Sequence, residues 1–400
     1  MGNPPTTTIP RHLDTLPDLP LQKQLIEHWA TYLVDAVLPI PSENNPFRWL
    51  ITPIALEGAR ASAESFNAAT AVFHLICASS ASHLWRRLGQ ENFLRLSLRH
   101  HHLGIRHIRY SLSSTNEAQY ISVLAALSMC LLHETLTVGT TFWRAHIRGA
   151  CGWLRSIKSS VLSKTKTLST AYQIFYGLVT MFQLQLTGED AAENDASTIP
   201  FHDPKQFYCI DTLYGLSRST FDALRKMIQL RQQAPSNSND LDLLEIEMLL
   251  SAPTRSESRC SADVEEMMYH QSYMFYYASL IYLKRSIRGA PSMDVQNLVR
   301  CTFTHLESMI ACTTRAFSPA VWPLAIAAFE TVETDLQGRV IKLLDHLGSL
   351  TEFDIWPALV MWSNNIWNAR QTNPDNPDSQ DLPWEQLLQR PENHPGILLV

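Results

Sequence analysis

Residues 120–134 read YISVLAALSMCLLHE and decide the fold class of this chain. The side chains that can face a core recur every three or four residues, at Tyr120, Leu124, Leu127, Leu131 and Thr135. This period belongs to an α-helix that buries one face, whereas a strand would alternate at every second residue. Because His133 and Glu134 end the apolar run, it is shorter than the roughly 20 residues that a membrane span needs.

The same helical period recurs further along the chain. It covers residues 174–186 and residues 264–282, while no stretch alternates convincingly as a strand and no fixed-period repeat is visible. We therefore predict an all-α fold, a large helical bundle or array of about a dozen or more helices.

The length and composition suit a protein with a large buried core. Of the 400 residues, 45 % are hydrophobic and only 18 % are charged, below the usual share of about a quarter. This balance favours one large helical domain or two closely packed lobes. The predicted parts are a flexible segment over residues 1–20, one domain over residues 21–391 and a loose tail over residues 392–400.

Polar stretches mark the predicted loops. Residues 187–200 (TGEDAAENDASTIP) are polar and end in proline, so we expect them to link lobes over residues 21–186 and 201–391. Residues 232–240 (QQAPSNSND) and 371–383 (QTNPDNPDSQDLP) are further loops by the same criterion.

Charge and cysteine content exclude several classes of protein. The formal net charge of −6 argues against a stand-alone nucleic-acid binder, which normally carries a basic balance or patch. Seven cysteines, none in a Cys-x-x-Cys pair, do not suggest a disulfide scaffold and fit a reducing intracellular compartment. The first residues lack the pattern of a secretory signal, so we expect a soluble protein with no membrane contact.

The familiar catalytic spacings are incomplete. The stretch His133-Glu134-Thr135 begins like a zinc-protease helix but lacks the second histidine one turn later, so a plain helix end is the better interpretation. No Gly-x-Ser-x-Gly elbow occurs, and Gly149-Ala150-Cys151-Gly152 is not a phosphate loop. We predict no catalytic, cofactor-binding or metal-binding residues and no enzymatic activity.

One acidic cluster leaves an enzyme alternative open. An all-helical isoprenoid enzyme holds magnesium through carboxylates on one helical face. The candidates are Asp240, Asp242, Glu245 and Glu247. No adjacent Asp-Asp pair or second acidic motif accompanies them, so we favour a helix start with acids near its N-terminal dipole.

The most distinctive charged pattern lies in residues 95–109. Four arginines and a histidine recur at spacings of four, three, four and three, so they share one helical face: Arg95, Arg99, His102, Arg106 and Arg109. Beside them we predict a core stripe of Leu94, Leu98, His101, Ile105, Ile108 and Leu112. The arginine face would contact DNA phosphates or an acidic partner, and the alternative is a solvated cationic surface.

The histidines near these arginines are weak candidates for a metal site. His100, His101, His102 and His107 have only Glu91 as a nearby carboxylate. Successive histidines on a helix also point in different directions, so they do not surround one ion.

Several segments, taken in order, resemble one protein family. They resemble the fungal-specific transcription factor domain of the second type, the regulatory region behind the zinc cluster in regulators similar to the acriflavine sensitivity control protein. The segments are residues 25–33 (LIEHWATYL), 45–56 (NPFRWLITPIAL), 71–84 (AVFHLICASSASHL), 99–112, 120–134, 143–154 (WRAHIRGACGWL), 319–330 (PAVWPLAIAAFE), 362–370 and 383–388 (PWEQLL).

The resemblance implies an all-α fold, nuclear action and transcriptional control, often of metabolic or secondary-metabolite genes. It supplies no catalytic residue. The six closely paired cysteines of the zinc-cluster module are missing from this sequence, so we expect DNA to be reached only indirectly, through a DNA-binding transcription factor or co-regulator. A small-molecule effector and a homodimer are further partners that we consider. For the effector we name an aromatic pocket near Phe175, Tyr176, Phe182, Tyr273 and Tyr276.

The glycines, proline and tryptophans within the segments that resemble the family have structural interpretations. Gly149 and Gly152 lie three apart and would let another helix approach closely. Pro323 would start or kink a helix. The expected apolar anchors near the C-terminus are Trp322, Trp362, Trp367 and Trp384.

Overall fold

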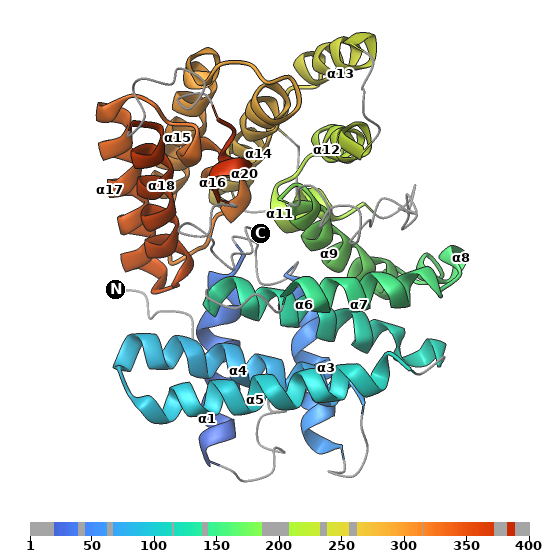
Figure 1. The fold of residues 1–400 in the computed structure, drawn as a ribbon. Coiled ribbons are helices and arrows are strands. Elements are labelled where there is room, and N and C mark those ends of the chain that lie inside the picture. The colour runs from blue at the N-terminus through green and yellow to red at the C-terminus, as the bar shows by residue number, and fades with distance from the viewer. Residues whose placement is uncertain are drawn as a thin grey trace. The chain divides into compact units, whose positions relative to one another are not determined.

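The computed structural model describes most of the chain. The described residues are 20–38, 45–61, 67–113, 116–137, 143–185, 208–232, 238–255, 262–313, 315–371 and 382–388. Every regular element among them is a helix, which confirms the predicted all-α array (Figure 1). The predicted flexible segment lies outside this part of the chain except for Pro20, which begins the first helix, and so do the predicted tail and the loop at residues 187–200.

α-Helices account for most of the described part of the chain. In chain order they are α1 (Pro20–His28), α2 (Val34–Ala36), α3 (Thr52–Arg60), α4 (Ala68–Leu88), α5 (Glu91–Ser111), α6 (Tyr120–Thr137), α7 (Trp143–Arg155), α8 (Ser159–Leu162), α9 (Lys166–Gln183), α11 (Ile210–Tyr214), α12 (Arg218–Gln232), α13 (Ser238–Leu250), α14 (Ala262–Tyr282), α15 (Gln296–Ala311), α16 (Val321–Phe329), α17 (Thr334–Thr351), α18 (Ile355–Gln371) and α20 (Trp384–Leu388). Shorter helical turns are η2 (Trp29–Leu33), η3 (Phe47–Ile51), η4 (Glu117–Gln119), η5 (Leu283–Ile287) and η6 (Ser292–Val295).

Contacts divide the chain into two compact units at a different place from the predicted lobes. The first unit comprises residues 1–36 and 42–133, and the second comprises residues 37–41 and 134–400. The division falls within α6 because the segments before and after residues 187–200 pack on each other. The Tyr214 hydroxyl donates to the Ile174 carbonyl at 2.8 Å, which joins α11 to α9 in one unit.

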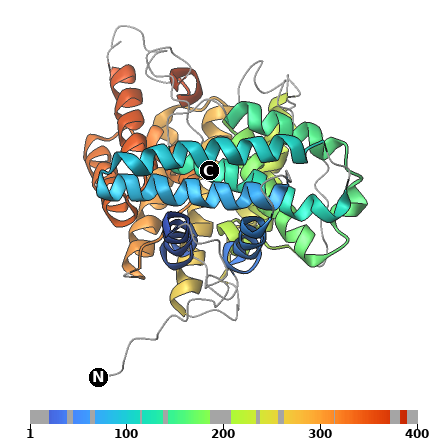
Figure 2. The ribbon, with the colours of Figure 1, turned by 90° about the horizontal axis from the view of Figure 1, so that it is seen from below.

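The first unit is built around α4. The Asn67 side chain caps this helix by accepting from the Thr70 backbone N–H at 2.7 Å. On one side α3 approaches so closely that a Cβ on Gly58 would lie 2.0 Å from the Ala69 carbonyl oxygen. On the other side α5 runs beside α4 as a hairpin, which Figures 1 and 2 both show.

Helix α6 buries the face predicted from its sequence, and it also buries residues outside that face. The predicted residues Tyr120, Leu124, Leu127, Leu131 and Thr135 are all buried. With the η4 turn the helix extends over Glu117–Thr137, longer than the sequence suggested, and it is long and apolar enough to span a membrane by length and composition alone. In its most apolar window 67 % of the residues are buried inside the structure, as in a core helix.

The second unit buries its aromatic anchors as predicted. Trp322, Trp362, Trp367 and Trp384 are all buried, and Pro323 lies in the first turn of α16, where its missing N–H is tolerated. A buried charge network lies at the end of α16. Glu330 accepts from Arg285 at 2.7 Å and from Arg370 at 3.0 Å.

Two sequence predictions about local structure are corrected. A Cβ on Gly149 or Gly152 would meet nothing within 4 Å, so these glycines do not admit a neighbouring helix. Close approach falls instead to Gly58, Gly104 and Gly177. The predicted loop over residues 232–240 is shorter, because α12 continues to Gln232 and α13 begins at Ser238. None of the six described cysteines forms a disulfide.

Candidate functional site

The arginine pattern lies on α5, which a tight turn joins to α4. Gly89 ends α4 with φ of +66°, a left-handed conformation that glycine adopts without strain, and its N–H donates to the Trp85 carbonyl at 2.7 Å. Only Gly89 and Gln90 separate the two helices, so α5 turns back directly along α4.

Helix α5 packs on α4 through small and polar residues. The Ser97 hydroxyl donates to the Ala78 carbonyl at 3.0 Å. The absence of a side chain at Gly104 makes room for Leu75, whose Cγ would lie 2.8 Å from an added Cβ. This close packing places Ser97 and Gly104 on the α4 side of α5 together with His100, while Leu98 lies in solvent.

The core stripe predicted for α5 is therefore wrong. Of the predicted residues Leu94, Leu98, His101, Ile105, Ile108 and Leu112, only Ile108 is buried. Leu98 is 62 % exposed. The buried face consists of Phe93, Ser97, His100, Gly104, His107, Ile108 and Ser111. Apolar periodicity alone pointed to the wrong face because small residues at this interface carry little hydrophobic signal.

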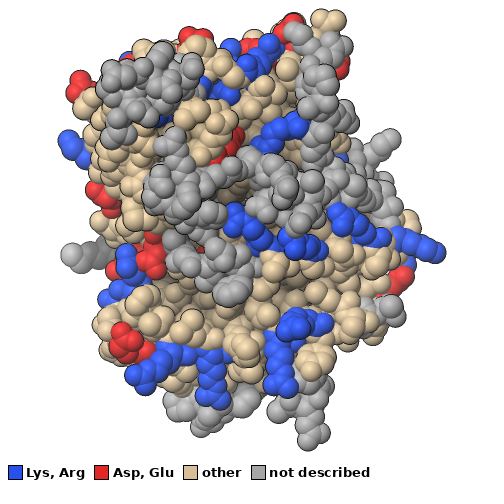
Figure 3. Space-filling model, viewed as in Figure 1, with Lys and Arg blue, Asp and Glu red and all other residues tan. Residues whose placement is uncertain are grey.

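The four arginines nevertheless share an exposed face. Arg95, Arg99, Arg106 and Arg109 are all exposed, and so is His102 between them. At 1.5 Å per residue the row extends about 21 Å along the helix. Figure 3 shows Lys and Arg side chains gathered over the part of the surface where Figure 1 places α5.

The face combines positive charge with exposed apolar surface. Arg95, Arg99 and Arg109 form no ion pair with any described residue, and Glu91 is the one acidic residue of α5. Leu98 is 62 % exposed and Tyr110 is 52 % exposed. Sequence reasoning missed both as surface residues, although each lies three or four positions from an arginine and so on the same side of the helix.

The α5 histidines do not converge on a point. His100 and His107 are seven residues apart, so about 10.5 Å of helix separates them. His74 of α4 lies near both, with ring centroids 5.1 Å from His100 and 5.6 Å from His107. The His101 ring instead lies tilted against the His133 ring, with centroids 4.7 Å apart, and His102 is exposed to solvent.

Burial favours the neutral form of both His74 and His100. Their Nδ1 atoms are 2.9 Å apart, so one ring donates and the other must offer a lone pair. Burial, with the neighbouring His100, His107 and Arg99, lowers the pKa of His74 to about 3. Burial and Arg99 lower the pKa of His100 to about 4.

Ion pairs occupy most of the acidic cluster on α13. Asp242 contacts Arg288 at 2.7 Å, and Glu245 contacts Lys284 at 2.7 Å. Glu247 contacts Lys226 at 3.1 Å. Asp240 lies in the first turn of α13, as the helix-start interpretation predicted. Basic partners on three of the four carboxylates offer no support for the magnesium-dependent enzyme alternative.

The aromatic residues named for an effector pocket lie in separate places. Phe175, Tyr176 and Phe182 are core residues of α9, where Tyr176 contacts Phe221 of α12. Tyr273 stacks instead on His305 of α15, with ring centroids 4.7 Å apart.

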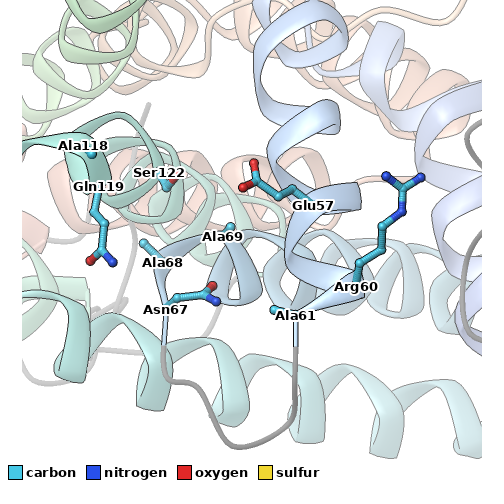
Figure 4. A pocket seen from close by; sticks show the side chains of 9 residues that line it. All are labelled: Glu57, Arg60, Ala61, Asn67, Ala68, Ala69, Ala118, Gln119 and Ser122. Atoms are coloured by element: carbon cyan, nitrogen blue, oxygen red, sulfur yellow. The ribbon is translucent and has the colours of Figure 1, made fainter.

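An open cleft of about 350 Å³ lies elsewhere in the first unit. It is lined by Glu57, Arg60, Ala61, Asn67, Ala68, Ala69, Ala118, Gln119 and Ser122. Figure 4 shows Glu57 pointing from α3 toward Ser122 while Arg60 points away. Polar residues of three elements therefore border this space.

Comparison with known proteins identifies the family. The fold places the chain among large all-α proteins. Within that class, residues 24–399 match the family model described as the fungal specific transcription factor domain, and the chain belongs to this family. Membership supports a role in transcription regulation. No curated protein and no solved structure matches the chain.

Proposed function

We propose that this protein regulates transcription in the nucleus by binding protein partners and that it catalyses no reaction. The family match over residues 24–399 carries this proposal. The expected partner is a DNA-binding transcription factor or co-regulator that controls a metabolic or secondary-metabolite gene cluster. DNA is then reached indirectly.

The exposed face of α5 supplies the contact in this proposal. A row of guanidinium groups attracts carboxylates and can bind them in bidentate geometry. The exposed Leu98 and Tyr110 beside the arginines add apolar area, which suits a protein segment better than a phosphate backbone. The net charge of −6 also opposes attraction of the whole molecule to DNA.

The test combines transcript profiling with chromatin precipitation. Deleting the gene should change a restricted set of transcripts. Replacing Arg95, Arg99, Arg106 and Arg109 with glutamate should weaken promoter recruitment about tenfold or more without unfolding the protein, because charge reversal repels an acidic partner.

A second variant with the same change in charge controls for net charge. It reverses four exposed basic residues of other elements, Lys158, Lys164, Arg315 and Lys342. This control should keep its recruitment. If the α5 variant is recruited to promoters as well as the original protein, its arginines form only a solvated surface. Tight, sequence-selective DNA binding by the pure protein would refute the proposal that it reaches DNA indirectly.

The cleft beside Glu57 and Asn67 favours effector sensing as a second candidate function. Its volume of about 350 Å³ falls at the lower end of the range for small-molecule sites. A small molecule that binds this cleft should raise the melting temperature of the protein. Loss of that rise in the Glu57→Gln variant would support this function. Sedimentation velocity would test the expected homodimer separately.

A further inference from the structure

Helix α13 exposes an unusual amount of apolar surface. Eleven large hydrophobic side chains are exposed among the described residues, and four of them belong to this 13-residue helix. Leu243, Ile246, Leu249 and Leu250 are between 52 % and 84 % exposed. A contiguous apolar patch of this kind marks an interaction surface more often than scattered single residues do.

The exposed residues form a stripe on the outer side of the helix. Leu243, Ile246 and Leu250 are spaced three and four apart, so they lie on one face. Leu244 and Met248 point the other way and are almost fully buried. Helix α13 is thus apolar on two sides, and its packing within the second unit uses only one of them.

Carboxylates border the stripe on both sides. By helical spacing Asp240 and Glu247 flank Leu243 on one side. Asp242 lies on the other side, where it pairs with Arg288 at 2.7 Å while its side chain stays 56 % exposed. The ion pair of Glu247 with Lys226 is solvent-exposed, so it leaves the carboxylate accessible to a competing cation.

A cleft of about 250 Å³ adjoins the stripe on the Glu247 side. It lies between α12 and α13, and Ala223, Leu244 and Met248 contribute its apolar lining. This space extends the surface with a recess for a partner's apolar side chain.

We propose that the outer face of α13 docks an amphipathic helix of a partner protein whose apolar stripe is bordered by lysine or arginine. The apolar stripe supplies the buried area, and the acidic borders select basic flanks. A second copy of α13 is a poor occupant because its own acidic borders would face these carboxylates. The proposed function uses the cationic face of α5 and an acidic partner, whereas this surface is acidic and selects a basic one. The inference therefore goes beyond the proposed function and does not depend on it.

Fluorescence anisotropy with a designed peptide tests the proposal. The probe is a labelled amphipathic helix with leucines every three or four residues and lysines beside them. Its control is a peptide of identical composition in scrambled order. Saturable binding of the probe to the full chain is expected, and the scrambled peptide should bind at least about tenfold more weakly.

Variants of exposed residues locate the site. Leu243→Ser with Leu250→Ser should weaken probe binding about tenfold or more, and Asp240→Lys should weaken it severalfold. The matched control replaces two exposed apolar residues elsewhere, Leu88→Ser with Met361→Ser, and should bind like the original protein. Circular dichroism and thermal melts confirm that each variant remains folded.

Three outcomes would overturn the inference. These are equal binding of probe and scrambled peptide, unchanged probe binding after the two leucine substitutions, and a dimer in sedimentation velocity that those substitutions dissociate. The last would make a second copy the occupant. None of them bears on promoter recruitment through α5, so the two proposals can fail separately.

Discussion

At the scale of single residues, the glycines show how position decides the effect of one methyl group. Gly58→Ala should destabilise the protein by about 1–3 kcal/mol, because the new Cβ would lie 2.0 Å from the Ala69 carbonyl oxygen and would force α3 away from α4. Gly149→Ala should stabilise it by up to about 1 kcal/mol, because that site is open and alanine favours a helix.

Chemical denaturation of the two variants measures both effects. Gly152→Ala is the internal control, since it occupies the same helix as Gly149 and also meets nothing within 4 Å. A stable Gly58→Ala variant would show that α3 can shift without cost.

At the scale of elements, histidine pairs join helices and should make their packing sensitive to acid. His74 and His100 join α4 to α5. In the unfolded chain a histidine titrates near pH 6.5, whereas burial lowers the pKa of these two to about 3 and about 4. As pH falls from 6.5 toward 4, the unfolded chain gains protons that the folded state does not, so stability present above pH 6.5 is progressively lost.

The expected result is a melting temperature that decreases between pH 7 and pH 5. Replacing His74 and His100 with phenylalanine should reduce this decrease, because the unfolded chain then takes up no proton at these two positions. Replacing the exposed His102 with phenylalanine should leave the decrease unchanged. Equal acid sensitivity of all three proteins would contradict the role of the pair.

Two further histidine pairs recur at helix contacts. His28 Nε2 lies 3.0 Å from His83 Nδ1 between α1 and α4. His270 and His305 join α14 to α15 through Nδ1 atoms 2.9 Å apart. Burial first, then the partner ring, lowers the pKa of His28 and of His305 to about 4. Some acid sensitivity should therefore remain after His74 and His100 are replaced.

At the scale of the whole molecule, the balance between a net charge of −6 and the cationic face of α5 limits DNA binding. The four arginines of α5 neutralise at most four phosphates. The slope of log K against log salt concentration should therefore be no steeper than about −3.6, with equal affinity for unrelated duplexes. Anisotropy titrations of two duplexes at several salt concentrations measure this.

The glutamate variant of the four arginines should lose this weak binding. A steeper slope would reveal basic surface beyond α5. A clear preference for one duplex would show that side chains reach base edges, because phosphate contacts alone carry no sequence information.

The sequence by itself determined the fold class, the exposure of the arginines and the burial of the tryptophans. Helical period and residue type are local properties, so the row from Arg95 to Arg109 was predictable from spacing alone. The large apolar surface of Trp322 and Trp384 likewise favours burial almost regardless of the surrounding topology.

Only the tertiary structure decided which face of each helix is covered. Helix α5 turns its small residues toward α4 because Gly104 and Ser97 permit close approach, and this leaves Leu98 in solvent. On α13 two apolar faces compete for one packing surface, so Leu250 stays outside while Leu244 is buried. The division into units likewise follows contacts between segments distant in sequence, such as Tyr214 with Ile174, which no local pattern encodes.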